Sequence, residues 1–344
     1  MNVDIVLPWV DGSDPDHAIK LGKWKKEVNK PTSSQERRFS DNGELKYCLR
    51  SIKKYAPWIR KVFVITDSQF PSFIDPWAAK KHNIHFIDHK VIFKGFEGVL
   101  PTFNSRSIGT FCWRIPGLSE NFIYLNDDFL FTSEVEVSDF FVDDKTIVRG
   151  NLIKVEDPSA LSRHERGKYN SVKYFKLSES EYLSSYHIAH AMKKSVLSRL
   201  FKKKMPLFTK NIAYRFRDSS QFLISSLFEN YSYFNGKAIL VDNVNHTHLS
   251  IKKTQEMSGE ELELVVDSMW SKKFSCINYM EELEAKVPRI RAELEERYRG
   301  SYKYEMGCVK YRGILFVEYY SSELIGFLKT QLRSLKKRLR KVNE

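Results

Sequence analysis

The fold is decided by one stretch of sequence, Phe122-Ile123-Tyr124-Leu125-Asn126-Asp127-Asp128. Its first four residues predict a buried strand, and a polar triplet follows that strand directly. Two adjacent carboxylates in this position form an oxygen-rich site suited to a divalent cation that shares phosphate oxygens. The triplet is also explained as a turn, because Asn and Asp are common turn residues. The residues alone leave both interpretations open.

Strand signals also lie upstream of this stretch, at Asp4–Val10, Lys61–Thr66 and Ile84–Asp88. Between the first two, residues 45–52 carry apolar side chains at helical spacing. Strand–helix alternation of this kind predicts an α/β fold with a mainly parallel sheet flanked by helices. Ligands of such sheets bind beyond the carboxyl ends of the strands. Three of these ends carry polar residues: Val10-Asp11, Thr66-Asp67 and Asn126-Asp127-Asp128.

The second half of the chain has a less regular pattern. Residues 145–180 are polar and predict loops, whereas residues 188–203 are basic and predict a helix. Ser258 and Glu261 form a capping box that opens the first helix of a largely helical C-terminal part. The chain shows no internal repeats and no low-complexity linker, so we expect a single catalytic unit over residues 1–320.

The composition indicates a globular protein with an anionic partner. The 344 residues are 42% hydrophobic, enough to bury a core, and the formal net charge is +13. A nucleotide, a phosphate polymer or a membrane surface fits this charge; nucleic acid fits poorly, because the basic residues are not clustered with stacking aromatics. Four cysteines without metal-site spacing predict buried thiols in a reducing compartment. No signal peptide and no run of membrane-spanning length is apparent, so we expect a cytoplasmic protein.

Two segments are candidates for phosphate binding. Residues 38–45 gather polar groups at the start of a predicted helix, whose N-terminus attracts anions. Capping alone also explains this segment, with Asp41 as the N-cap and Glu44 three residues on. Arg217 is suited to bidentate phosphate recognition, or to a structural ion pair with Asp218.

Two histidine pairs are further candidates. His187 and His190 are three residues apart, which places them on one face of the predicted helix. Each is suited to a role as general base or metal ligand, and equally to an ordinary surface position. His246 and His248 lie on one face of a predicted strand, but nothing in the sequence supplies a third ligand, so we interpret them as structural.

The tail at residues 321–344 combines an apolar stripe with positive charge. Leucines recur there every three or four residues, and seven basic residues lie between Lys329 and Lys341. A basic amphipathic helix is typical of a membrane-surface anchor, which would place the protein on the inner face of the plasma membrane. A helix that binds a partner protein explains the pattern as well.

Taken together and in order, these segments resemble the Stealth family of sugar-phosphate transferases. That family includes bacterial capsule polymerases and the animal GlcNAc-1-phosphotransferase of lysosomal enzyme targeting. Its first conserved region resembles Asp4–Pro15, and its second resembles Arg38–Trp58 (RFSDNGELKYCLRSIKKYAPW) and continues through the strand quoted first. The third is looser, with His190 followed by Arg217–Gln221, and the fourth is Lys273–Asn278. The four regions lie at residues 1–15, 36–135, 185–225 and 272–280.

Three positions depart from the family pattern. Pro8 stands where the family has Thr, Gly109 where Glu is usual, and Tyr279 where the fourth region has Asp. The last departure removes a second carboxylate from that region. Asn278 is then the residue of the family's Asn-Asp pair that this chain keeps. None of the three departures falls at His190 or within the polar triplet after the quoted strand.

The resemblance implies a GT-A-like, Rossmann-like core and a particular reaction. A hydroxyl of a growing capsular polysaccharide attacks the β-phosphorus of a nucleotide sugar, with UDP-GlcNAc the favoured donor. Nucleoside monophosphate leaves, and hexose-1-phosphate becomes part of a phosphodiester. Mg²⁺ or Mn²⁺ is the implied cofactor. The alternative is a metal-dependent GT-A glycosyltransferase, which releases nucleoside diphosphate.

The resemblance also implies roles for individual residues. His190 aligns with the family's conserved histidine and is the expected base, with Asp41 in reserve. Arg217 is expected to bind the transferring phosphoryl group. Asp127 and Asp128 are the expected metal ligands. The expected substrate-binding residues are Trp9, Asp11, Asn42, Glu44, Arg50, Asn104, Ser105 and Asn278.

Overall fold

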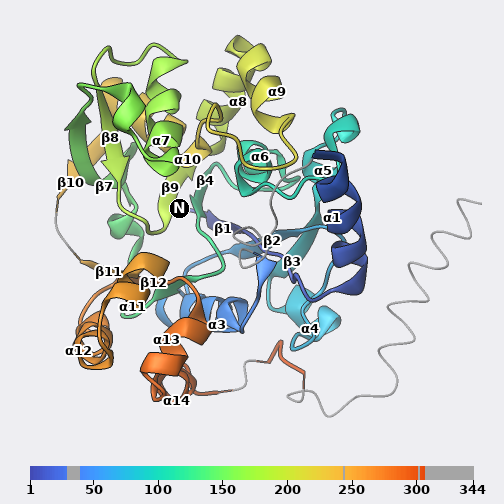
Figure 1. The fold of residues 1–344 in the computed structure, drawn as a ribbon, viewed down its shortest axis with the longest axis vertical. Helices are drawn as coiled ribbons and strands as arrows, with labels where there is room; N and C mark the ends of the chain where they lie inside the picture. The colour runs from blue at the N-terminus through green and yellow to red at the C-terminus, as the bar shows by residue number, and fades with distance from the viewer. Residues whose placement is uncertain (29–38, 243–244, 301–302, 307–344) are drawn as a thin grey trace, which may run out of the picture. The chain divides into compact units, whose positions relative to one another are not determined.

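A computed structural model of the chain describes residues 1–28, 39–242, 245–300 and 303–306. The chain divides into two compact units, one formed by residues 1–71 and 84–299 and the other by residues 72–83 and 300–344. Figure 1 shows the larger unit, which contains all the described candidate residues. A single catalytic unit over residues 1–320 stays a prediction, and the predicted tail helix at 321–344 lies outside the described residues.

A five-stranded sheet forms the centre of the larger unit. Its strands, in spatial order, are β3 (Ile84–Asp88), β2 (Lys61–Thr66), β1 (Val3–Pro8), β4 (Asn121–Tyr124) and β9 (His190–Lys193). β1 to β4 run parallel, and β9 pairs antiparallel with β4. The predicted α/β fold with a mainly parallel sheet is confirmed, and the order β3-β2-β1-β4 is of the Rossmann type.

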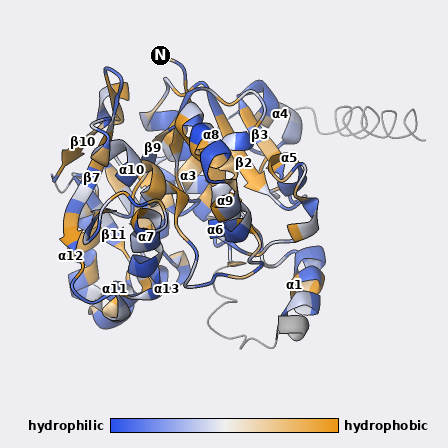
Figure 2. Ribbon diagram, turned by 90° about the horizontal axis from the view of Figure 1, so that it is seen from above, coloured by the Kyte–Doolittle hydropathy of each residue, from blue (hydrophilic) through white to orange (hydrophobic). Residues whose placement is uncertain are grey.

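Helices cover both sides of this sheet. Figure 1 shows α6 (Ser105–Thr110), α8 (Lys194–Lys203) and α9 (Met205–Ile212) on one side and α3 (Glu44–Tyr55) on the other. Three further helices are α1 (Pro15–Val28), α5 (His89–Ile92) and α10 (Ile224–Phe234). Buried aromatic side chains fill the core on the α6 side: Phe93, Phe111, Phe122, Phe208, Phe222 and Phe228. In Figure 2 the strands β2 and β10 are largely orange; the apolar residues of β2 are buried, whereas those of β10 are half-buried.

A second sheet occupies the region that we expected to be loops. Its strands are β10 (Ala238–Val241), β7 (Lys145–Lys154), β6 (Phe141–Val142) and β8 (Glu181–Ser185), and α7 (Arg163–Lys173) precedes β8. The loop prediction for residues 145–180 is therefore wrong. The second half of β7 is exposed, Leu152 and Ile153 included, but its backbone hydrogen-bonds to β8, and backbone pairing does not require buried side chains.

The C-terminal part is built on a third, small sheet. It consists of β11 (His246–Leu249), β12 (Phe274–Ile277) and β5 (Phe129–Phe131). Four helices surround it: α11 (Ile251–Glu256), α12 (Gly259–Met269), α13 (Met280–Lys286) and α14 (Ile290–Arg297). The predicted capping box is confirmed, because Ser258 and Glu261 each accept the other's backbone N–H at the start of α12. The predicted largely helical character is confirmed for these residues.

The smaller unit is described by few residues. Its helix α4 (Pro76–Lys81) begins after Asp75, whose side chain accepts a hydrogen bond from the Ala78 backbone N–H. Ile74 forms an antiparallel bridge with Glu305. Within the described part of the chain, no helix has the length and apolar character needed to cross a membrane.

Candidate functional site

A cavity of about 400 Å³ opens at the carboxyl edge of the central sheet. Trp9 and Val10 line it after β1, Asp67 after β2, and the Asn126-Asp127-Asp128 triplet after β4. The strand ends that the sequence marked as polar therefore meet at one site. This follows from the parallel order of β1, β2 and β4, because the carboxyl ends of parallel strands share one edge.

Acidic groups form one wall of this cavity. Burial raises the pKa of Asp127 well above its ordinary value, and the charges of Asp128, Asp41 and Glu44 raise it further. Burial likewise raises the pKa of Asp128, to about 6, against a hydrogen bond from the Asn278 side chain that lowers it. The pKa of Glu44 is also raised by burial. Several carboxylates in one poorly hydrated place repel one another unless a cation or protons neutralise them.

The acidic wall has the donor set of a site for a hard divalent cation. Asp128 Oδ2 accepts the Asn278 hydrogen bond, whereas Asp128 Oδ1 is buried and has no hydrogen-bond partner among the described residues. A buried carboxylate oxygen without a partner is costly, and a cation satisfies it. Asp127 adds a second oxygen ligand, so the residues present fit Mg²⁺ or Mn²⁺. The pair accounts for one or two ligands, which leaves room for phosphate oxygens.

A guanidinium lines the same cavity as the acidic wall. Arg217 lines the cavity, and its Nη2 donates to Ser105 Oγ over 2.6 Å. Ser105 is the first residue of α6, so the hydrogen bond holds the guanidinium against the helix N-terminus. Arg217 and Ser105 also line a second cavity of about 140 Å³. The two cavities thus adjoin along a wall that carries a positive charge.

A histidine–carboxylate pair borders the second cavity, which is lined by the histidine. His190, the first residue of β9, places its Nδ1 2.7 Å from Glu229 Oε1. Glu229 is on α10 and only 2% exposed, and its other oxygen lacks a hydrogen-bond partner in the described structure. The carboxylate fixes the orientation of the ring and leaves Nε2 as the atom that can exchange a proton. Such a pair can act as a general base.

Comparison with known proteins places the chain in a family. Residues 38–149 match the sequence profile described as Stealth protein CR2, conserved region 2. The chain belongs to the Stealth family.

Relatives in this family are named for polysaccharide phosphotransfer. The chain is 40% identical over 143 residues to the capsular polysaccharide phosphotransferase cps1A of Actinobacillus pleuropneumoniae, covering 41% of this chain and 38% of that one. It is 32% identical over 248 residues to the exopolysaccharide phosphotransferase SCO6023 of Streptomyces coelicolor, covering 70% of this chain and 41% of that one. The chain thus matches about two fifths of the length of these relatives.

A more distant likeness exists among solved structures. The galactosyltransferase LgtC, solved in complex with donor and acceptor sugar analogs, is 14% identical with a TM-score of 0.43, over 88% of this chain and 98% of that one. The family assignment rests on the sequence matches and not on this likeness.

The second Stealth region contributes several residues to the lining of the larger cavity. Its helix α3 begins at a different residue than we predicted. Asn42 and Glu44 line the larger cavity with Trp9, whose Nε1 donates to Asp41 Oδ2 over 2.7 Å. The prediction that Asp41 is the N-cap of α3 is wrong: the N-cap is Gly43, with a φ of 94°, and its N–H donates to Asp41 Oδ1. Glycine tolerates this left-handed conformation, so residues 41–43 close as a turn before the helix begins.

His187 and His190 do not share a helical face. β9 occupies residues 190–193 and α8 begins only at Lys194, so the expected helix over 188–203 starts six residues later than predicted. The run His-Ala-Met-Lys is too short for a periodicity to distinguish strand from helix. His187 precedes the strand and lines both cavities, whereas His190 lines the smaller one.

Of three further predicted substrate-binding residues, one lines a described cavity and two do not. Asn278 lines the larger cavity, between Asp128 and His248. Asp11 accepts from the backbone and hydroxyl of Ser13 within a turn, and Arg50 forms an ion pair with Glu295 at 2.7 Å. Neither belongs to the described lining of the two cavities. Their substrate roles stay predictions.

Two residues of the smaller cavity were not expected from the sequence. Lys168 donates to the Ser185 carbonyl over 2.7 Å, and burial lowers its pKa. His164 lies beside it, and burial also lowers the pKa of this ring. Nothing in the spacing of Lys168, His164 or Glu229 marks them, because they reach the site only through the packing of α7 against β8 and α10, and of α10 against β8 and β9.

Asn104 is fully buried and supports the cavity from behind. Its Oδ1 accepts from the Arg106 N–H and caps α6, while its Nδ2 donates to the Tyr214 carbonyl and to Gln221 Oε1, both over 2.9 Å. Gln221 also accepts from the Asp218 backbone N–H. These bonds join the start of α6 to the loop that carries Arg217.

Replacing Asn104 by alanine should destabilise the protein. The loss of the cap and of two buried hydrogen bonds should lower the free energy of unfolding by about 2–4 kcal/mol. Denaturant titration followed by circular dichroism measures this change. Asn235→Ala is the matched control, because that exposed Asn donates only to the Tyr231 carbonyl and should change stability by less than about 0.5 kcal/mol. Equal stability of the two variants would contradict the assigned structural role of Asn104.

Proposed function

We propose that the chain transfers hexose-1-phosphate from a nucleotide sugar to a hydroxyl of a capsular polysaccharide, releasing nucleoside monophosphate. The observation that carries this proposal is that one cavity is lined by both an acidic pair and Arg217, and that the adjoining cavity is lined by His190, which pairs with buried Glu229. The names of the relatives support phosphotransfer to a polysaccharide. N-acetylhexosamine is the proposed sugar, with UDP-GlcNAc as the donor.

The larger cavity is the proposed donor site. Asp127 and Asp128 would hold Mg²⁺ or Mn²⁺, which when bound neutralises charge on the diphosphate and on the departing monophosphate. Arg217 binds the nonbridging oxygens of the transferring phosphoryl group, because a guanidinium fork matches their geometry. Ser105 fixes the angle of that fork through the 2.6 Å hydrogen bond. Trp9 offers an apolar surface at the same cavity wall.

The smaller cavity is the proposed entry for the acceptor. His190 takes the proton of the attacking hydroxyl at Nε2, and Glu229 holds the ring through Nδ1 and stabilises the positive charge that the ring acquires. The hydroxyl oxygen then approaches the phosphorus past Arg217, which borders both cavities. In-line displacement requires attack and departure on opposite sides of the phosphoryl group, and entry of the acceptor and the donor through two adjoining cavities is compatible with it. Asp41 is the reserve base, although both of its oxygens accept hydrogen bonds from the protein.

The nucleotide product distinguishes this reaction from its alternative. Phosphoryl transfer breaks the bond between the two phosphates, so UDP-GlcNAc should yield UMP, and the polymer should show a phosphodiester resonance by phosphorus NMR. A GT-A glycosyltransferase breaks the bond between the sugar and its phosphate and yields UDP. Chromatography of the nucleotides, with a panel of other nucleotide sugars and capsule oligosaccharides, measures the outcome. UDP together with a polymer free of phosphorus would overturn the proposal.

The proposed location of the protein is the cytoplasm, with peripheral attachment to the inner face of the plasma membrane. The basic, leucine-rich pattern of residues 321–344 supports this proposal.

A further inference from the structure

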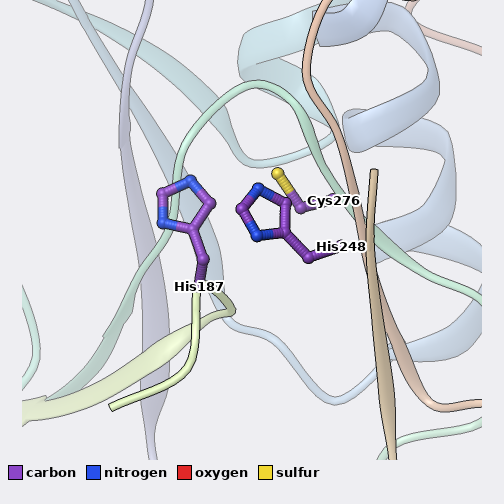
Figure 3. Close-up of side chains that lie close together, drawn as sticks. All are labelled: His187, His248 and Cys276. Atoms are coloured by element: carbon purple, nitrogen blue, oxygen red, sulfur yellow. The ribbon is translucent and has the colours of Figure 1, made fainter. Parts of the chain in front are cut away.

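Two histidines and a cysteine from three separate segments converge beside the larger cavity. His187 comes from the turn before β9, His248 from β11 and Cys276 from β12, and Figure 3 shows the two rings facing one another with the sulfur next to His248. One ligand atom of each residue lies within 4.8 Å of those of the other two. The ring centroids of the two histidines are 4.8 Å apart. The third ligand that the sequence did not supply for His248 is therefore present in the fold.

We propose that His187, His248 and Cys276 bind a zinc ion, separate from the Mg²⁺ or Mn²⁺ proposed at Asp127 and Asp128. Nitrogen and sulfur are the ligands that zinc prefers, whereas magnesium and calcium prefer oxygen. Tetrahedral zinc with bonds of about 2.0 Å to nitrogen and about 2.3 Å to sulfur needs its ligand atoms about 3.3–3.6 Å apart. Side-chain shifts of roughly 1 Å would bring the three atoms to that spacing.

The chemistry of the three side chains suits a metal ligand. Burial lowers the pKa of His187 well below its ordinary value, and it also lowers that of His248, so both rings are neutral and carry a lone pair. Cys276 is fully buried, and without a metal its pKa lies well above the ordinary value. A bound cation reverses that preference, because it displaces the thiol proton to solvent and stabilises the thiolate.

Asn278 provides the support that metal ligands usually have. Its Oδ1 lies 2.9 Å from His248 Nε2, and its Nδ2 donates to Cys276 Sγ over 3.4 Å. Hydrogen bonds of this kind orient the ligands of a metal and stabilise a thiolate. The same Nδ2 donates to Asp128, so the proposed zinc site and the acidic pair share one supporting side chain.

Three protein ligands leave the fourth position of a tetrahedral ion open. His187 lines both cavities, so the proposed ion would border the space where substrate groups bind. Water or a substrate oxygen can complete the coordination. This arrangement differs from a closed structural zinc site, which uses four protein ligands.

Cobalt binding tests the proposal without any activity measurement. The full chain, stripped with a chelator, should bind one equivalent of Co²⁺ with the visible bands of a tetrahedral site and a thiolate-to-cobalt absorption in the near ultraviolet. Zn²⁺ should displace the cobalt, and a large excess of Mg²⁺ should not. Because oxygen-only sites give no thiolate absorption, the test is independent of the metal at Asp127 and Asp128 and of the proposed reaction.

Matched cysteine variants assign the signal to the site. Cys276→Ser should remove the thiolate absorption and weaken zinc binding by at least ~100-fold, because it removes the one thiolate of the three ligands. Cys112→Ser, a change at an equally buried thiol in the apolar core, should leave both unchanged. His187→Gln should lose tetrahedral coordination while circular dichroism reports an intact fold. Absence of the absorption in the wild type, or its survival in Cys276→Ser, would overturn the proposal.

Discussion

Replacing Asp128 by asparagine should lower kcat/KM on the order of 10²-fold or more, because the acidic wall would lose one of the two ligands that we propose for a cation on the donor diphosphate. Asparagine keeps the size of the side chain, so the cavity should keep its shape. Asp127→Asn should act in the same direction, and chelation by EDTA should abolish turnover of the wild type. The measurement is steady-state release of nucleotide with and without added Mg²⁺ or Mn²⁺.

The control for this change is a carboxylate outside the cavity. Asp144 is 77% exposed in its side chain and pairs with Lys193 and Lys237, so Asp144→Asn should leave kcat/KM near the wild-type value. Restoration of the Asp128→Asn rate by higher metal concentration would support a ligand role. Full wild-type activity in EDTA would contradict the proposed metal site. The proposed reaction would still be tested separately, by identifying its nucleotide product.

The raised pKa values give the metal a predictable effect on stability. The pKa of Asp128 in the folded protein is about 6, above its ordinary value, so its protonated form favours folding at low pH. That contribution is present below pH 3.8 and is lost as the pH rises through about 6. The metal binds the ionised carboxylates, so Mn²⁺ should raise the Tm more at about pH 7.5 than at about pH 5. Equal shifts at both pH values would contradict a site that contains Asp128.

Replacing His190 by alanine should lower kcat by 10²–10⁴-fold, the usual contribution of a positioned general base. Nucleotide binding should survive, because His190 lines the smaller cavity and not the proposed donor site. Glu229→Gln keeps a side chain of the same size but removes the charge behind the ring, so its loss of kcat should be smaller. Isothermal titration with the nucleotide, alongside the rate measurement, separates an effect on kcat from one on binding.

His85→Ala is the matched control, since that residue of β3 is not among those that line either described cavity. It should retain wild-type kcat. If His190→Ala also stays near the wild type while Asp41→Asn is inactive, the base is Asp41 and His190 has only a structural role.

The parallel sheet was predictable because its strands are apolar on both faces. The runs at β1, β2 and β4 contain consecutive buried residues, and such runs differ clearly from amphipathic helices; β3, at the edge of the sheet, is mostly half-buried. β9 lacked this signal, since only Ala191 and Met192 of its four residues are apolar. The second sheet was missed for the related reason that β7 is exposed along half its length.

Part of the candidate site could not be predicted from a single sequence. The pairing of His190 with Glu229 joins residues 39 positions apart, and it depends on how α10 packs against β9. The convergence of His187 with Cys276 depends on the third sheet, whose strands come from both halves of the chain. Spacing within a segment reports which residues share a face, but not which segments meet.

The antiparallel direction of β9 makes the position of His190, the proposed base, sensitive to insertions. Tyr124 at the end of β4 pairs with His190 at the beginning of β9, so β4 ends and β9 begins at the same edge of the sheet, where the candidate site lies. A slip of one residue would turn His190 to the opposite face. Insertion of one residue within β9 should therefore be far more damaging than insertion into the exposed segment 156–160, and chains of this family should vary in length at the second place rather than at the first.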